Sequence, residues 1–144
     1  AAGNVLYPAL IHHGFAVGTY AEKSDDGLHL TNCRISNAVR CLPPGNKPVG
    51  AEVNACRSYL KAEIEAMPSL KVILALGRIA HESTVAALGY RQAAVLFSHG
   101  VFHDLYALTL ADSYHCSRYN LNTGRLTETM FNQVLTDISR RFFF

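Results

Sequence analysis

The stretch richest in reactive and hydrogen-bonding side chains is "SYHCSRYNLNTGR", residues 113–125. No acidic residue lies between Asp112 and Glu128, although His115 and several cations and hydrogen-bond donors do. Hydroxyl, amide, guanidinium and glycine N–H groups supply most protein hydrogen bonds to nucleic-acid backbones. The pattern favours a loop that grips phosphates beside a reactive histidine, with a solvated polar loop as the alternative. The candidate phosphate-binding residues are Ser117, Arg118, Asn120, Asn122, Thr123, Gly124 and Arg125.

A second candidate segment is "SNAVRCLPPGN", residues 36–46. Asn37 lies in a strand-like run, where asparagine is disfavoured. Its amide offers one acceptor and two donors, which suits the reading of a base edge. A structural asparagine at the end of a strand is the plain alternative.

The four cysteines, Cys33, Cys41, Cys56 and Cys116, do not form a dense disulfide framework. Cys41 and Cys56, which have fourteen residues between them, could ligate zinc or an iron–sulfur cluster. No C-x-x-C completes a set of four, so two buried apolar thiols are the alternative. The histidines match no zinc-enzyme spacing, and no role is assigned to His12, His13, His29, His81 or His99.

The whole chain sets broad limits on these readings. At 144 residues it is expected to form one domain, residues 1–144, with a sizeable core. A formal net charge of +2 excludes a strongly basic protein, so any surface that binds nucleic acid must be local. The absence of a secretory segment or a transmembrane-length apolar run favours a cytoplasmic protein.

Hydrophobic periodicity predicts the elements that position these residues. Helices are expected over residues 4–14, 51–67 and 79–88 and from Thr127 onward, and strands over 30–41, 71–77, 93–97 and 105–111. This alternation predicts an α/β fold with a mostly parallel sheet and helices on both faces. Ligands in such folds bind beyond the carboxyl ends of strands, which selects residues 36–44 and 114–125 as the site.

Read in order, these segments resemble the uracil-DNA glycosylases of family 5, also called type b. The resemblance rests on "SNAVRCLPPGNKP", Cys56, "LALGRIA", "FSHG" and above all "SYHCSRYNLNTGRLT", and it covers nearly the whole chain. The last stretch is similar to the family's "YH-x-S-R-x-N-x-x-T-G-R-L-T" motif, with Cys116 where the family commonly has proline or an aliphatic residue. Family 4 enzymes share the first motif but not the T-G-R loop.

The resemblance implies a three-layer α/β/α fold with a central, mostly parallel four-stranded sheet. It implies a DNA-repair enzyme that removes uracil, and also hypoxanthine or xanthine, from DNA. It further implies a four-iron, four-sulfur cluster, with Cys41 and Cys56 matching the last two ligands. The first two ligands and the first active-site motif are expected upstream, so the chain is expected to be truncated at its N-terminus.

The resemblance also implies roles for single residues, which fit the cost of flipping a base into a pocket. Asn37 reads the uracil edge, and His115 donates a hydrogen bond to the departing base. Ser117 and Arg118 hold the flanking phosphates, and residues 122–126 enter the duplex. The expected partner is DNA containing uracil or another deaminated base, bound by a nucleoid-associated monomer away from membranes. A truncated, non-catalytic module that binds DNA or another protein is the alternative.

Overall fold

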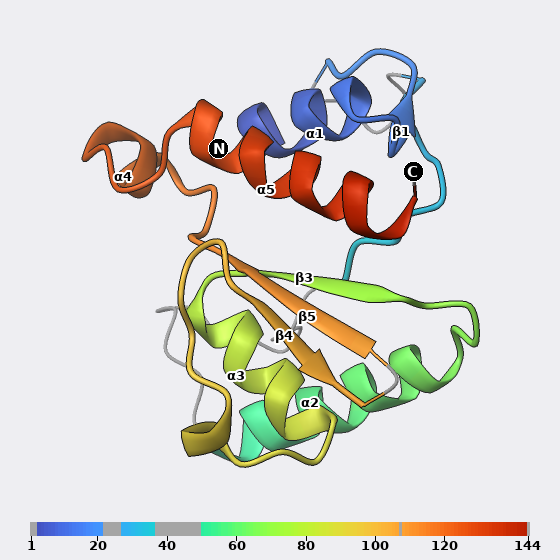
Figure 1. The fold of residues 1–144 in the computed structure, drawn as a ribbon, viewed down its shortest axis with the longest axis vertical. Helices are drawn as coiled ribbons and strands as arrows, with labels where there is room; N and C mark the ends of the chain where they lie inside the picture. The colour runs from blue at the N-terminus through green and yellow to red at the C-terminus, as the bar shows by residue number, and fades with distance from the viewer. Residues whose placement is uncertain (1–2, 22–26, 37–49, 107, 144) are drawn as a thin grey trace. The chain divides into compact units, whose positions relative to one another are not determined.

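A computed structural model describes residues 3–21, 27–36, 50–106 and 108–143, and for residues 3 and 50–57 it describes the backbone only. The chain divides into two compact units (Figure 1). The first unit joins residues 1–35 to residues 114–144, and the second comprises residues 36–113. The α/β class predicted from the sequence is confirmed.

The second unit is built on a three-stranded sheet of order β3-β5-β4. Strand β3 (Val72–Leu76) pairs in parallel with β5 (Leu108–Ser113), and β4 (Phe102–Leu105) pairs with β5 antiparallel. Among the described residues the sheet is therefore mixed, and β5 is its central strand. Strand β3 lies at the edge of this sheet among the described residues, and four of its five residues are only partly buried.

Helix α3 (Arg78–Ala87) packs on β3 and on helix α2 (Gly50–Glu65), as Figure 1 shows. Gly77 joins β3 to α3 with a φ of 98°, a left-handed conformation that glycine adopts readily. Its N–H donates to the carbonyl oxygen of Ser113 at 2.8 Å, which ties together the ends of the two parallel strands. The buried core of this unit consists of Ala75, Val85, Val95, Leu105 and Leu110.

The first unit pairs helix α1 (Gly3–His12) with helix α5 (Glu128–Phe142) (Figure 1). Helix α5 begins as predicted at Thr127, whose hydroxyl accepts the Met130 N–H at 3.1 Å. One face of α5 is buried because its apolar residues recur at helical spacing: Phe131, Val134, Leu135 and Ile138. The unit also holds the two-stranded antiparallel pair β1 (Ala16–Val17) and β2 (His29–Leu30) and helix α4 (Arg118–Asn122).

Two strand predictions need correction. The strand expected over residues 30–41 is seen only as β2, and its described residues 31–36 are not in a strand, while residues 37–41 lie outside the described part. The strand expected over residues 93–97 is wrong, because Gln92–Ala94 forms the 3₁₀ helix η1. Backbone donors there bond locally, and the Val95 carbonyl contacts His81 instead of a strand. In the part of the chain that the structure describes, no helix is long and apolar enough to cross a membrane.

Candidate functional site

Residues 113–127, which include no acidic residue and are called the acid-free segment below, do not form a simple loop, because they contain the short helix α4. Ser117 caps this helix: its hydroxyl accepts the Asn120 N–H at 3.1 Å, and its carbonyl accepts the Leu121 N–H. A serine at this position stabilises a helix start by about 1 kcal/mol. The side chain of Arg118, the first residue of α4, is exposed. Sequence periodicity missed this element because a helix of five residues spans little more than one turn.

Asn120 organises the segment around His115. Its side-chain amide donates to the His115 carbonyl at 2.9 Å, and its own carbonyl accepts the Leu126 N–H at 3.1 Å. His115 itself is exposed. The asparagine therefore fixes the backbone of the candidate catalytic histidine while its imidazole faces solvent.

Local hydrogen bonds also form a turn at the C-terminal end of the segment. The Thr123 hydroxyl donates to the Tyr119 carbonyl at 2.9 Å, and Gly124 follows with a φ of 78°. Asn122 and Arg125 are exposed, and the Arg125 guanidinium lies 5.7 Å from the centre of the Tyr114 ring. The structure thus gathers the predicted phosphate-binding residues from Ser117 to Arg125 in one exposed turn.

Two apolar residues of this turn, one near each end, are fully buried. Cys116 and Leu126 are both 0% exposed. The structure therefore assigns Leu126 to the core, whereas the sequence placed it in a segment that enters DNA. Burial also raises the pKa of the Cys116 thiol to about 12, so this cysteine is held as a neutral thiol and is a poor metal ligand.

The other predicted site residues cannot be compared in the same way. Asn37 and Cys41 lie outside the described residues. Cys56 lies on helix α2, but its side chain is outside the described part. An iron–sulfur cluster of this kind needs four thiolates, and Cys41 and Cys56 would supply two of them.

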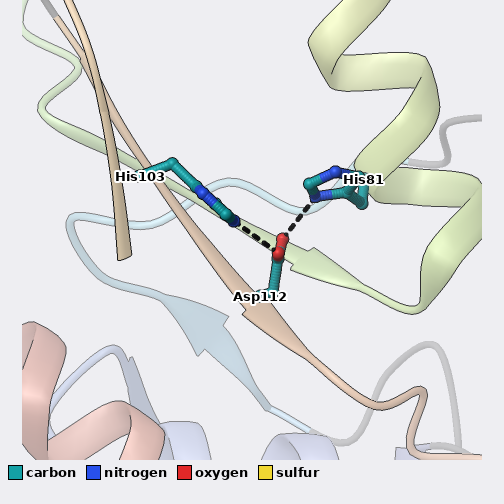
Figure 2. Close-up of side chains that lie close together, drawn as sticks. All are labelled: His81, His103 and Asp112. Carbon is teal, nitrogen blue, oxygen red and sulfur yellow. Dashed lines mark hydrogen bonds and ion pairs between the residues drawn. The ribbon is translucent and has the colours of Figure 1, made fainter. Parts of the chain in front are cut away.

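The second unit contains a polar cluster that sequence reasoning did not identify. Asp112 on β5 lies between two imidazoles: its Oδ1 is 2.8 Å from His81 Nδ1 and its Oδ2 is 2.8 Å from His103 Nε2 (Figure 2). His81 and Asp112 are 1% and 0% exposed, and His103 is 15% exposed. The three residues come from α3, β4 and β5, so only the sheet register and the packing of α3 bring them together. A buried aspartate in an apolar strand was the one signal in the sequence.

Comparisons with known proteins place the chain in a family. A family model described as the uracil DNA glycosylase superfamily matches residues 1–139. The chain is 41% identical over 141 residues to the type-5 uracil-DNA glycosylase of Thermus thermophilus, covering 97% of this chain and 64% of that protein. It is 36% identical over 135 residues to the type-5 uracil-DNA glycosylase of Pyrobaculum aerophilum, covering 94% and 58%.

The type-5 uracil-DNA glycosylase of Mycobacterium leprae is 36% identical over 142 residues, covering 96% of this chain and 62% of that protein. The chain thus spans about three fifths of the length of these curated relatives. Since the family model covers almost all of its residues, the chain belongs to the uracil DNA glycosylase superfamily.

Proposed function

We propose that the protein is a DNA-repair enzyme that excises uracil from DNA by hydrolysing the N-glycosidic bond. The observation that carries the proposal is the exposed His115, whose backbone is held by Asn120 within an acid-free turn. The names of the type-5 relatives support the same activity. As the resemblance to type b enzymes implies, the proposal extends to the deaminated purines hypoxanthine and xanthine.

The proposed reaction requires the protein to bind an extruded base and to stabilise the negative charge that develops on it. Extrusion costs a few kcal/mol, which phosphate contacts on either side of the flipped nucleotide offset. Ser117 and Arg118 stand at the start of α4, where their hydroxyl and guanidinium groups suit such contacts. The neighbouring exposed groups of Asn122, Thr123 and Arg125 extend the same positive, acid-free surface.

His115 is proposed to act on the departing base. As the glycosidic bond breaks, its electron pair moves to the base, and an imidazole N–H near the base oxygen stabilises that negative charge. One well-placed donor contributes about 3 kcal/mol in the transition state, or roughly a hundredfold in rate. Asn37 is proposed to read the base edge through its amide, and water is the nucleophile that completes hydrolysis.

The test is single-turnover excision from a duplex with one uracil, followed by alkaline cleavage of the abasic strand. His115→Ala is expected to slow excision roughly a hundredfold while DNA affinity stays close to the parent value. His29→Ala, which removes another exposed histidine of the same unit, is the matched control. Equal losses of excision and binding would contradict a catalytic role, and binding without excision by the parent protein would support the non-catalytic alternative. Substrates with hypoxanthine or xanthine test the wider specificity.

We also propose Cys41 and Cys56 as ligands of a four-iron, four-sulfur cluster. What supports this is the match of both cysteines to the last two ligand positions of the family pattern. The cluster would supply structural cross-linking, and no step of the proposed reaction passes through it. Purified protein is expected to be brown, with iron and acid-labile sulfide that Cys56→Ser lowers sharply. A colourless, iron-free protein would leave both cysteines as ordinary thiols.

A further inference from the structure

In the cluster of His81, His103 and Asp112, one short contact joins two atoms that each offer a lone pair and no hydrogen. His81 Nε2 lies 2.7 Å from the Val95 carbonyl oxygen. A carbonyl oxygen can only accept, so Nε2 must carry a hydrogen. In a neutral imidazole, Nδ1 then has a lone pair. That lone pair faces the Asp112 carboxylate at 2.8 Å, and an ionised carboxylate also offers only lone pairs.

Two facing lone pairs in a buried site repel each other unless a proton or a cation lies between them. A proton on His81 Nδ1, a proton on the Asp112 carboxyl, or a bound metal ion meets this requirement. Within the described residues, the other hydrogen-bond partners of the Asp112 carboxylate are the His103 imidazole and the Ser98 N–H at 3.3 Å, and both lie at Oδ2. The contact between Nδ1 and Oδ1 is therefore completed by a proton or by a metal ion.

The ligand atoms suit a metal ion. One nitrogen from each histidine and a carboxylate oxygen all lie within 4.8 Å of one another. Imidazole nitrogen with carboxylate oxygen is a donor set typical of zinc and related divalent ions. Three protein ligands leave a fourth tetrahedral position for water, and the partly exposed His103 provides the side from which an ion enters.

The groups around the cluster already orient its members. The Val95 carbonyl fixes the tautomer of His81 and directs the Nδ1 lone pair toward Asp112, as partners of ligating histidines commonly do. The ligands also come from three packed elements, α3, β4 and β5, rather than from one loop. Ligands of a tetrahedral zinc ion lie about 3.3 Å apart, so each 2.8 Å contact would open by about 0.5 Å, and the two histidine nitrogens, which lie within 4.8 Å of each other, would also have to reach about this separation.

We infer that His81, His103 and Asp112 form a binding site for a divalent transition-metal ion, with zinc as the best-matched ion. The site shares no residue with the His115 turn, and no step of the proposed excision chemistry uses it. A bound ion cross-links α3, β4 and β5 and so stabilises the second unit. It also fixes the end of β5, the strand that leads along the chain to His115.

The test uses Co²⁺ as a spectroscopic substitute for zinc, titrated into purified protein that has been stripped with a chelator. The parent protein is expected to bind Co²⁺ with visible d–d bands, and His103→Gln is expected to weaken that binding by more than about tenfold. His29→Gln is the matched control, since it removes an exposed histidine of the other unit. Ultraviolet thiolate-to-cobalt bands report ions held by cysteines, and the difference between parent and His103→Gln removes their contribution.

Asp112→Asn is the second variant, designed to keep the fold. Its amide can point an N–H at His81 Nδ1 and its carbonyl at His103, so the lone-pair conflict is removed without a cation. Zn²⁺ is expected to raise the unfolding temperature of the parent by several degrees, to leave Asp112→Asn unchanged, and Mg²⁺ is expected to shift neither. Loss of the cobalt bands in both variants but not in His29→Gln supports the site. Equal binding by all variants, or a parent that neither binds Co²⁺ nor responds to Zn²⁺, overturns it and leaves a proton shared by His81 and Asp112 as the explanation of their contact.

Discussion

The variant Leu126→Ala tests whether Leu126 stabilises the folded protein from within its core or inserts into DNA. Leu126 is 0% exposed and directly follows the exposed Arg125 at the end of the acid-free turn. Truncating a fully buried leucine removes its transfer free energy and leaves a cavity, at a cost of about 3–5 kcal/mol. For a chain of this size, that cost lowers the unfolding temperature by roughly 10–17 °C.

The assay is thermal or urea unfolding followed by circular dichroism, with DNA affinity and single-turnover excision measured well below the transition. We expect a large loss of stability and nearly unchanged DNA affinity. Leu96→Ala is the control, because Leu96 is 70% exposed and its truncation should change stability by no more than about 0.5 kcal/mol. Unchanged stability together with a strong loss of binding would refute the reasoning, since it would mean that Leu126 acts on DNA and not in the core.

Two further predictions concern neighbouring residues of the same turn. If the Arg118 guanidinium contacts one phosphate, Arg118→Ala should reduce the magnitude of the slope of log affinity against log salt concentration by about 0.9. The control is Arg140→Ala, at the exposed end of α5, which should leave the slope unchanged. Equal slopes for the two variants would exclude the Arg118 contact. Burial raises the pKa of Cys116 from 9.0 to about 12, so its thiol favours the folded state fully below pH 9 and loses that contribution as pH rises toward 12. Cys116→Ala should flatten the fall in unfolding free energy over this window, and an unchanged pH profile would show that the thiol titrates normally.

Local sequence patterns predicted the elements whose signals are long or strongly periodic. Helix α5 carries a cap at Thr127 and an apolar face at helical spacing, and β3 is an uninterrupted apolar run. The short elements escaped prediction because the signals for them are weak. Strand β4 has four residues and depends on its pairing with β5, and α4 depends on the Ser117 cap.

The candidate functional residues also fall into those that the sequence could reveal and those that it could not. The turn from His115 to Leu126 is contiguous in sequence, so its composition and motif made it visible. His81, His103 and Asp112 are far apart along the chain, and no spacing rule connects a helix residue to two strand residues. Only the register that sets Asp104 opposite Thr109, and Phe102 opposite Ala111, together with the packing of α3 on β3, brings them into contact. Such clusters follow from tertiary structure alone.

The hydrogen bonds that shape the acid-free turn join residues 115–126 to one another, from the Asn120 amide on the His115 carbonyl to the Leu126 N–H on the Asn120 carbonyl. Its conformation is therefore encoded by those residues and by its two buried ends, Cys116 and Leu126. Such a self-contained segment is a natural unit for exchange between homologous enzymes. Chimeras that keep both ends and replace the exposed residues between them are expected to preserve the conformation of the turn.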